Sequence, residues 1–569
     1  MLFVKGPRSK LAVERLGPLP VVNRFLDRLG LDELLAEFVP SQDRESGLSY
    51  AKALGVLLRS IIVEREPIYR QQETVQTFAP GAFGVDEREA AHLSDDRVGR
   101  ALDRLFDADR TALLTKTVLR MGKRFEVRFD ELHNDSTTIR FTGQYREARG
   151  RRMRGKRAPW ITYGFSKDHR PDLKQLLFIL TTSADGGVPV QFRCEDGNRA
   201  DVDTHVKTWE ALRRVAGKPD FLYVGDSKLC ETETMDYIDA HKGRFVTVLP
   251  RTRSEDAHFR KRIQTEEPQW EPVWDRRNPR RKYGPRDRWW VWLDPLPSQE
   301  AWPIIWVYSS LLRLKHDHTR RERLAQADEA LKELKRRLCS PRSKLRKPNE
   351  VEKHVERILR RYSVARYLKV EKFMQEEHRY RQNRRGRPGK QTSYRRITRR
   401  HWDIEWTLGK ATVEYDRKSD GMYPLLTNDK ELTPTQVLEA HKGQIAIENR
   451  FRQVKSVHEI APVLLHNEGR IEALFFLYFL ALLVQGLIER ELRRAMEREG
   501  IETLALYPEE RESKHPTTEQ VLRLFSLLQR NVLLRRGRAV EIFEPEFTEL
   551  QRLVLRLLGV PPRAYRRAR

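Results

Sequence analysis

Hydrophobic positions recur at three- and four-residue intervals in two stretches near the N-terminus of the chain, residues 17–38 and 94–121. This spacing is typical of amphipathic helices. Ser94 and Asp95 stand where the second stretch begins, and both residue types favour the N-cap position of a helix. We therefore predict a helical N-terminal domain over residues 1–125, with DNA binding as its expected role.

The helical spacing gives way to strand-like alternation after residue 125. Three consecutive strands followed by helix, strand, helix and strand predict a mixed sheet covered by helices over residues 126–250. The turn between the second and third strands is predicted at Asp185-Gly186-Gly187. The five predicted strands lie within 125–143, 173–192 (two strands), 219–229 and 244–250. The two predicted helices lie within 201–217 and 231–243.

Residues 251–430 form a long insertion that interrupts the predicted core. Tryptophans alternate within 286–297, which favours packing in a strand, with stacking on an unpaired DNA base as the alternative. Apolar residues at helical spacing over 324–338 and again over 351–362 predict an antiparallel helical hairpin. Residues 379–401, dense in Arg, are interpreted as a basic linker.

A strand-like segment at 406–416 lies near the end of the insertion, and the second part of the core is predicted over residues 431–497. That part consists of a helix within 433–456 and a strongly apolar helix within 471–497. The remaining residues, 498–569, are predicted to be a helical C-terminal region with a role in dimerisation.

Basic residues strongly outnumber acidic ones: 109 Lys and Arg stand against 82 Asp and Glu, for a formal net charge of +27. This balance indicates a polyanionic partner, and nucleic acid is the leading one because neutralised phosphates release condensed counterions. An anionic membrane surface is the alternative. However, the longest apolar run, 473–484, has 12 residues, whereas about 20 are needed to cross a bilayer. We predict a buried helix there and no membrane partner.

The three cysteines, Cys194, Cys230 and Cys339, lie far apart and lack the spacing of a disulfide framework or a zinc site. The first residues show no signal-peptide pattern. We therefore expect a reducing compartment, with the protein in the cytoplasm and associated with the nucleoid.

Three acidic residues stand out by their positions. Asp135 lies on the first predicted strand and Asp226 at the C-terminal end of the fourth, where functional sites form beside the switch point of a sheet. Glu448 lies in a helical segment, 439–460, that is crowded with Lys and Arg. For each residue alone, a turn, a helix cap or a solvated ion pair is the alternative interpretation.

Together, Asp135, Asp226 and Glu448 suit a metal-dependent phosphodiester site. Three carboxylates can hold two divalent cations about 4 Å apart, one activating the attacking water and the other stabilising the leaving oxygen. Oxygen ligands favour Mg2+, with Mn2+ as an alternative. We predict these three residues to be the catalytic residues and the ligands of two Mg2+ ions. Three further acids near the same sheet rank below them: Asp130, Asp196 and Asp201.

Basic residues surround Glu448. On an ideal helix Arg452 and Lys455 share its face, because they lie four and seven positions further on. Cations so placed can bind the phosphates on either side of the scissile one. We predict that Arg452, Lys455, Lys442 and Arg450 bind DNA.

The order of strand acid, strand acid and helix acid, with a large insertion before the helix, resembles the DDE transposases of bacterial insertion sequences. The stretch "IENRFRQVKS" is similar to the last motif of one branch, which reads Tyr, two residues, Arg, three residues, Glu, six residues, Lys. Glu448 and Lys455 keep that spacing, whereas His441 and Gln444 stand at the Tyr and Arg positions. Further segments that resemble this branch are 166–175, 196–198 and 420–428.

The resemblance implies an α/β fold: a ribonuclease H-like mixed sheet interrupted by a β-plus-helical insertion, with helical N- and C-terminal regions. It also implies hydrolysis of one strand at a transposon end and attack of the released 3′ hydroxyl on target DNA. The implied partners are double-stranded DNA, as transposon ends and target, and a second copy of the chain in a homodimeric synaptic complex.

Two other functions fit the same sequence. One is a non-catalytic DNA-binding regulator derived from a transposase, since the charge explains binding equally well. The other is a ribonuclease H-like endonuclease that hydrolyses DNA without joining it. Magnesium-dependent cleavage separates the regulator from both enzymes, and strand joining separates the two enzymes from each other.

Overall fold

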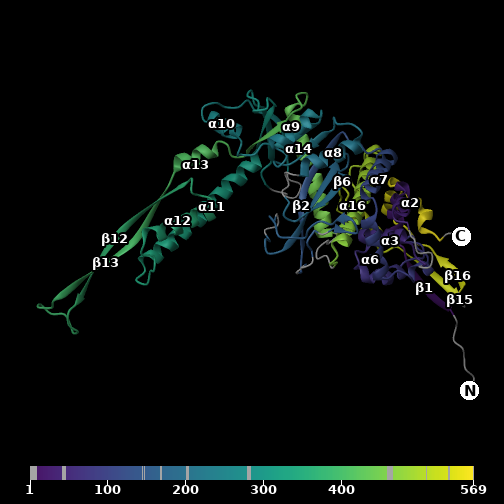
Figure 1. Cartoon of the computed structure of the whole chain (residues 1–569), viewed down its shortest axis with the longest axis horizontal. Coiled ribbons are helices and arrows are strands. Elements are labelled where there is room, and N and C mark those ends of the chain that lie inside the picture. The colour runs from purple at the N-terminus through teal and green to yellow at the C-terminus, as the bar shows by residue number, and fades with distance from the viewer. Residues whose placement is uncertain are drawn as a thin grey trace, which may run out of the picture. The chain divides into compact units, whose positions relative to one another are not determined.

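The computed structural model describes most of the 569-residue chain. The chain divides into two compact units, which we call the core unit (Met1–Thr247 with Glu439–Arg569) and the insertion unit (Val248–Leu438), coloured along the chain in Figure 1. The described residues are 9–40, 47–143, 145, 148–150, 152–166, 170–199, 204–277, 284–457, 465–507, 509, 511–535 and 538–567.

Helices form most of the N-terminal part of the core unit, as the sequence predicts. Their apolar stripes are buried, and the Ser94 hydroxyl accepts a hydrogen bond of 3.1 Å from the Arg97 N–H, the N-cap predicted at that residue. The helices are α1 (Leu19–Leu29), α2 (Leu31–Phe38), α3 (Tyr50–Val63), α4 (Gln71–Gln76), α5 (Glu87–Ala90), α6 (Asp95–Asp107) and α7 (Arg110–Phe125).

A mixed sheet occupies the middle of the core unit. Its strands lie in the order β6-β5-β2-β7-β8. The β2 strand pairs antiparallel with β5, which pairs antiparallel with β6, whereas β2-β7 and β7-β8 are parallel. This arrangement matches the predicted ribonuclease H-like core. The strands are β2 (Glu131–Phe141), β5 (Lys174–Ser183), β6 (Pro189–Glu195), β7 (Leu222–Val224) and β8 (Arg244–Val248).

Helices cover both faces of this sheet. On one face, Trp209 of α8 (His205–Ala216) is fully buried against Phe221, just before β7, and Tyr237 of α9 (Thr232–Ala240). On the other face lies α16 (Glu468–Arg498), whose Phe475 ring packs against Phe178 of β5.

The helix α16 is the segment predicted to be apolar and buried. It is long and apolar enough to cross a membrane, with a mean hydropathy of 2.2 in its most apolar window, but 89% of that window is buried inside the protein. A helix covered on all sides by protein is typical of a large hydrophobic core. The prediction of a buried core helix is confirmed.

The C-terminal region is not entirely helical, in contrast to the prediction. It contains α17 (Thr518–Phe525) and α18 (Glu549–Leu557), but also two strands, β15 (Gln529–Arg535) and β16 (Arg538–Phe543). These strands form a three-stranded sheet with β1 (Ser9–Arg15) of the N-terminal region. The N-terminal region is therefore not entirely helical either.

One part of the insertion unit consists of four antiparallel strands beside α10 (Ser254–Arg262). Its alternating tryptophans pack against other rings: Trp290 lies 5.0 Å from Tyr308 and Trp292 lies 5.9 Å from Phe259, measured between ring centroids. Packing is therefore the observed role of this alternation. The strands, in sheet order, are β14 (Met422–Thr427), β11 (Ile304–Ser309), β10 (Asp287–Leu293) and β9 (Glu271–Arg276).

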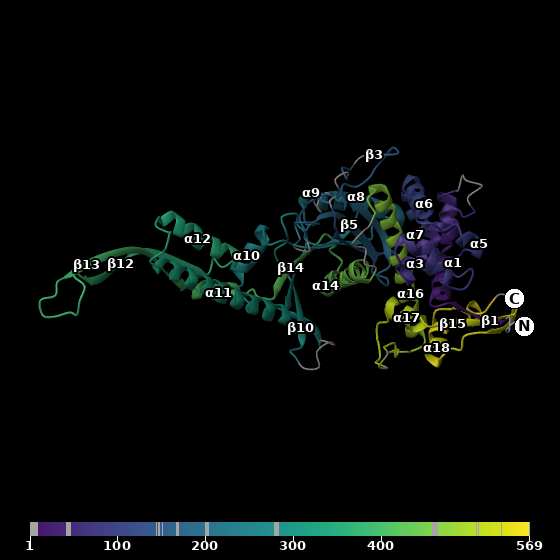
Figure 2. The ribbon, with the colours of Figure 1, turned by 90° about the horizontal axis from the view of Figure 1, so that it is seen from below.

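Another part of the insertion unit contains the predicted helical hairpin. It consists of α11 (Ser310–Cys339) and α12 (Pro348–Arg361), which lie side by side in Figures 1 and 2. The predicted stripes form one hydrophobic cluster, whose buried members are Ala327, Leu331, Leu334, Leu338, Val351, Val355, Val364, Leu368 and Ile404.

The predicted basic linker is instead ordered as a long two-stranded ribbon. The strands β12 (Leu368–Gln382) and β13 (Tyr394–Leu408) pair antiparallel over their whole length. The segment predicted to be a strand at 406–416 mostly forms α13 (Lys410–Arg417), because Gly409 ends the ribbon and precedes the first helical turn.

Candidate active site

Asp135 and Asp226 lie at the same level of neighbouring parallel strands. In the register of β2 and β7, His133 stands opposite Val224. Asp135 follows His133 by two residues on β2. Asp226 follows Val224 by two residues and lies just beyond the end of β7. Because neighbouring strands lie about 4.8 Å apart, this register brings the two backbones together at one place in the sheet.

The Asp135 side chain is on the sheet face that α16 covers. Residues at even spacing along a strand share a face, so Asp135 shares its face with Phe141. The Phe141 ring lies 6.3 Å from Phe475 of α16, measured between centroids. On β7, the Tyr223 hydroxyl lies 3.1 Å from His205 Nδ1 of α8, so the Tyr223 side chain is on the opposite face of the sheet. Because side chains alternate between the two faces along a strand, the next residue, Val224, is on the face of Asp135, and the chain continues from there to Asp226.

Each aspartate side chain is held by a local hydrogen bond. Asp135 Oδ1 accepts the Ser136 N–H at 2.7 Å, and Asp226 Oδ1 accepts the Lys228 N–H at 3.0 Å. The hydroxyl of Thr247, on β8, also donates to the Asp226 carbonyl oxygen at 2.7 Å. Both side chains are half-buried, which leaves them in reach of a ligand from solvent.

Glu448 lies on α15 (Ile445–Arg452), which contacts β2 and β5. Its side chain is exposed. The helix begins just after Gly443, whose Cα position is so close to His133 of β2 that an added Cβ would lie 2.6 Å from the ring. His133 and Asp135 share a face of β2, so the segment carrying Glu448 approaches the sheet on the face of Asp135.

The three predicted acids thus stand on β2, just after β7, and on a helix that contacts β2 and β5, but they do not form a closed ligand cluster. Among the described residues, no three His, Cys, Asp or Glu side chains are grouped closely enough to hold one metal ion. The donor set itself, two aspartates and one glutamate, has the hard oxygen atoms that Mg2+ and Mn2+ prefer.

Arg450 does not have the exposed position that DNA binding requires. Its side chain is 4% exposed, and its guanidinium lies 2.9 Å from the Glu489 carboxylate of α16, which is 5% exposed. It also donates to the Gly187 carbonyl oxygen at 2.8 Å and to Gln453 Oε1 at 2.7 Å. The prediction that Arg450 contacts DNA is wrong, because its charge is used inside the protein to hold α15 against α16 and the β5–β6 turn.

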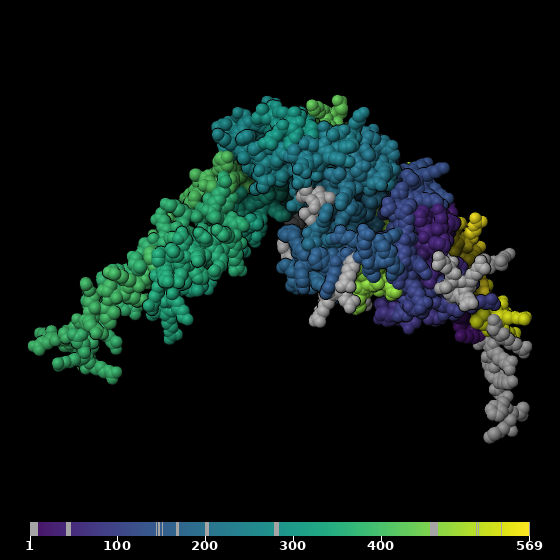
Figure 3. All heavy atoms as spheres, in the orientation of Figure 1, coloured from purple at the N-terminus to yellow at the C-terminus, as the bar shows by residue number. Residues whose placement is uncertain are grey.

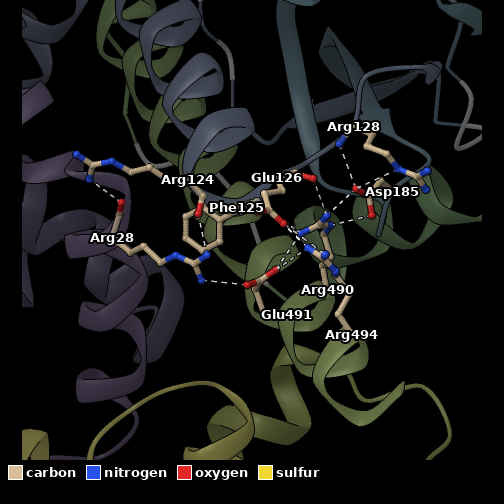
Figure 4. A network of polar contacts seen from close by, with 9 residues as sticks. All are labelled: Arg28, Arg124, Phe125, Glu126, Arg128, Asp185, Arg490, Glu491 and Arg494. Atoms are coloured by element: carbon tan, nitrogen blue, oxygen red, sulfur yellow. Dashed lines mark hydrogen bonds and ion pairs between the residues drawn. The ribbon is translucent and has the colours of Figure 1, made fainter. Parts of the chain in front are cut away.

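A second buried arginine holds the other side of the same turn. Arg490 of α16 donates to both carboxylate oxygens of Asp185, at 2.8 and 2.6 Å, and to the Phe125 carbonyl oxygen (Figure 4). Although burial raises the pKa of the Asp185 carboxyl, the hydrogen bonds from Arg490 and from the Arg128 N–H outweigh it and hold that pKa below its usual value. Asp185-Gly186-Gly187, predicted as a turn, is therefore also an anchoring point.

The remaining predicted DNA-binding residues keep accessible positions. Arg452 is exposed one helical turn after Glu448, and Lys442 and Lys455 are half-exposed. The predicted continuous helix is interrupted, however: α14 (Pro434–Gly443) ends before α15, and a π-helical turn occupies Gln453–Val457. Lys455 lies in this wider turn, so the ideal-helix argument for its alignment with Glu448 does not apply.

His441 and Gln444, which stand at the Tyr and Arg positions of the motif, carry no positive charge at neutral pH. Burial, together with the charge of Lys442 and the neighbouring His133, lowers the pKa of His441 to about 3. The Gln444 amide nitrogen is buried and has no hydrogen-bond partner among the described residues. Neither residue supplies the charge that Arg has at this place in the motif.

The acids ranked lower have other partners or fall outside the described residues. Asp130 forms an ion pair of 3.0 Å with Lys218, and Asp196 accepts the Trp160 N–H at 2.8 Å. Asp201 lies outside the described residues. So do positions 167–169 of segment 166–175, one of the segments that resemble the transposase branch. Sequence reasoning missed Glu489 and Arg490. Charged residues that follow the apolar run within the same predicted helix were a signal that pointed to them.

Comparisons with known proteins identify the family of the chain. Residues 131–484, more than half of the chain, match the family described as "Transposase DDE domain". The chain belongs to the DDE transposases. Residues 11–119 of this transposase match a domain of unknown function, DUF4277, and no curated protein matches the chain.

Among solved structures, the cryo-electron microscopy structure of a piggyBac transposase synaptic complex with hairpin DNA has a weak structural similarity to this transposase. The two are 10% identical with a TM-score of 0.26, over 53% of this transposase and 63% of that chain, less than two thirds of its length. This likeness is too low to support an argument about function.

Proposed function

We propose that this transposase cuts the DNA at the ends of a bacterial insertion sequence and joins the released 3′ hydroxyl to target DNA. The observation that carries the proposal is the register of β2 and β7, which brings Asp135 level with Asp226 on the face that the Glu448 segment approaches. Glu448 and Lys455, which have six residues between them, support membership of the branch with the Tyr-Arg-Glu-Lys motif.

Asp135, Asp226 and Glu448 would hold two divalent cations, Mg2+ or Mn2+. Bound there, these cations would supply the positive charge that acidifies water and stabilises the leaving oxygen of a phosphodiester. The residues of the chain do the rest. The two aspartates would hold the cations at the sheet, and Glu448, exposed on α15, would be the third ligand.

DNA binding next to this site would fall to Arg452, Lys455 and Lys442. Arg452, one turn after Glu448, suits a phosphate next to the scissile one, because a guanidinium can donate two parallel hydrogen bonds to phosphate oxygens. A homodimer that holds two transposon ends, and a cytoplasmic, nucleoid-associated location, belong to the same proposal.

The test uses a labelled duplex that carries the inverted repeat flanking the gene, incubated with the full chain and Mg2+. We expect nicking at the repeat and joining to a second duplex. Nicking should fall by more than about 100-fold in Asp135→Asn, Asp226→Asn and Glu448→Gln, since even changes around metal ligands cost 10- to 100-fold. Asp130→Asn is the matched control, because this acid precedes the same strand and pairs with Lys218.

The outcomes separate the alternatives. Nicking without joining by the wild-type chain would indicate a hydrolytic endonuclease. Binding of the repeat without nicking would indicate a regulator. Equal nicking by the wild type and Asp135→Asn would remove Asp135 from the active site.

A further inference from the structure

The ribbon β12–β13 of the insertion unit has an anchored half and a free half. Near its base, Ile404 is fully buried in the hydrophobic cluster with α11 and α12, Lys335 of α11 donates to the Ile404 carbonyl oxygen at 3.0 Å, and the Trp406 indole donates to Asp328 at 2.9 Å. The outer half extends past these helices, as Figures 1 and 2 show. An isolated two-stranded ribbon is only marginally stable, so this anchored base holds the outer half in place.

The outer half carries a dense and unbalanced charge. Residues 379–400 contain nine Arg, one Lys and no Asp or Glu. Most of these side chains are exposed, and the space-filling view in Figure 3 shows the tip standing free of the rest of the insertion unit. A positive charge of this density in solvent requires counterions.

Acidic residues of the ribbon neutralise some of this charge, but not most of it. Arg379 and Arg399 lie 2.9 and 3.8 Å from the Glu377 carboxylate, and Arg400 pairs with Glu376. The other seven cations have no carboxylate partner among the described residues: Arg381, Arg384, Arg385, Arg387, Lys390, Arg395 and Arg396.

The strand register concentrates these unpaired cations. Arg381 stands directly opposite Arg395, and Arg396 stands opposite Tyr380. Like charges at directly opposite positions destabilise a strand pair. Beyond them, the loop that closes at Gln382 and Tyr394 surrounds a hollow of about 620 Å3 lined by Arg384, Arg385, Arg387 and Lys390, among others. The ribbon therefore carries a repulsion that a polyanion would relieve.

We propose that the outer half of the ribbon is an arm that binds double-stranded DNA through its phosphates. The inference rests on the proposed function, which makes duplex DNA the partner. A two-stranded ribbon fits the major groove, which is about 12 Å wide, but not the undistorted minor groove of about 6 Å. Cations on both faces of the ribbon then reach the two phosphate backbones that border the groove, so the arm binds without preference for base sequence.

The test measures how duplex affinity depends on salt, by fluorescence anisotropy with the full chain and duplexes of unrelated sequence. Each phosphate contact contributes a slope of about −0.9 to the logarithm of affinity against the logarithm of salt concentration. For the variant R381Q/R384Q/R395Q/R396Q we expect a slope shallower by about 3 to 4, equally on every sequence.

The control variant removes the same charge from the same unit, at exposed cations that already have carboxylate partners. It is R321Q/K332Q/R360Q/R417Q, whose partners are Asp317, Asp328, Glu356 and Glu414. We expect a slope within about 1 of the wild-type value. A second variant replaces residues 383–393 by Asn-Gly, a pair that closes two-residue hairpins, and so removes four cations while the strands remain paired.

A wild-type slope in both ribbon variants would overturn the inference, and so would an equal loss of slope in the control variant. This outcome differs from failure of the proposed function, in which the wild-type chain binds duplex DNA but does not nick it. A wild-type chain that binds no duplex would overturn both. Melting of each variant at the wild-type temperature shows that the comparison is made on folded protein.

Discussion

The helix that carries Glu448 depends on a buried ion pair, and Glu489→Gln tests this dependence. The substitution keeps the size of the side chain but removes the charge that faces Arg450 at 2.9 Å, where both side chains are at most 5% exposed. Glu489 also accepts the Thr518 N–H at 2.9 Å. Breaking a buried pair on one side costs about 3–5 kcal/mol, because the remaining charge is left without compensation. We therefore expect α15 to open locally about 100- to 5,000-fold more often.

Hydrogen exchange followed by mass spectrometry measures this opening in peptides that cover residues 445–457. The control is Glu497→Gln, because Glu497 is an exposed glutamate on α16, the helix that carries Glu489. For this variant we expect no change in the exchange of residues 445–457. The double variant Arg450→Met/Glu489→Leu should recover most of the protection, since a hydrophobic pair of similar volume replaces a buried ion pair at little cost. A less than threefold change in Glu489→Gln would show that the pair does not hold α15 and would refute the reasoning.

Three further predictions concern stability. His441 has a pKa of about 3 in the folded protein, against an ordinary value near 6.5. Between these two pH values the unfolded chain binds a proton that the folded chain does not. The free energy of unfolding therefore falls as the pH is lowered through this range. His441→Gln should therefore lose about 2–3 kcal/mol less than the wild type between pH 7 and pH 4.5 in urea titrations; equal losses would contradict this. Gly443→Ala places a Cβ 2.6 Å from the buried His133 ring and should lower stability by about 1–2 kcal/mol in the same assay, despite the helix propensity of Ala; a stabilised variant would contradict this. Gly197→Ala places a Cβ against the Gln175 carbonyl oxygen, inside the van der Waals contact distance, and should cost about 3 kcal/mol, whereas an unchanged urea midpoint would show that the backbone yields there.

Much of the core could be predicted from local periodicity. The strands β5 and β6 are joined by the short turn predicted at Asp185-Gly186-Gly187, so their antiparallel pairing follows from the sequence. The sheet of β1, β15 and β16 was missed because its first two members pair across more than 500 residues, as in Ser9 with Arg535, and no local pattern reveals such a pairing. The ribbon was missed because its outer strands are charged on both faces, and its buried contacts, such as Ile404, are confined to the base.

The candidate site shows the same limit. Asp135 and Asp226 could be singled out because their strands are recognisable in the sequence: Asp135 lies within the first strand and Asp226 just after the fourth. Arg450 was misassigned because its burial depends on Gly187 and Glu489, which are distant in the sequence. The alignment of Lys455 with Glu448 was misjudged because a π-helical turn replaces the ideal helix there.

The central claim is that Asp135, Asp226 and Glu448 hold the same cations. Iron-mediated cleavage of the protein backbone tests it most directly, because it locates the bound cation without any transposon DNA. Fe2+ bound in place of Mg2+, with ascorbate and peroxide, produces hydroxyl radicals that cut the chain next to the metal, and mass spectrometry locates the cuts. We expect cuts in three segments, around Asp135, Asp226 and Glu448, all competed by Mg2+ and all lost together in Asp135→Asn. Cuts in one of these segments alone, or cuts that persist in Asp135→Asn, would contradict the claim that the three acids hold the same cations.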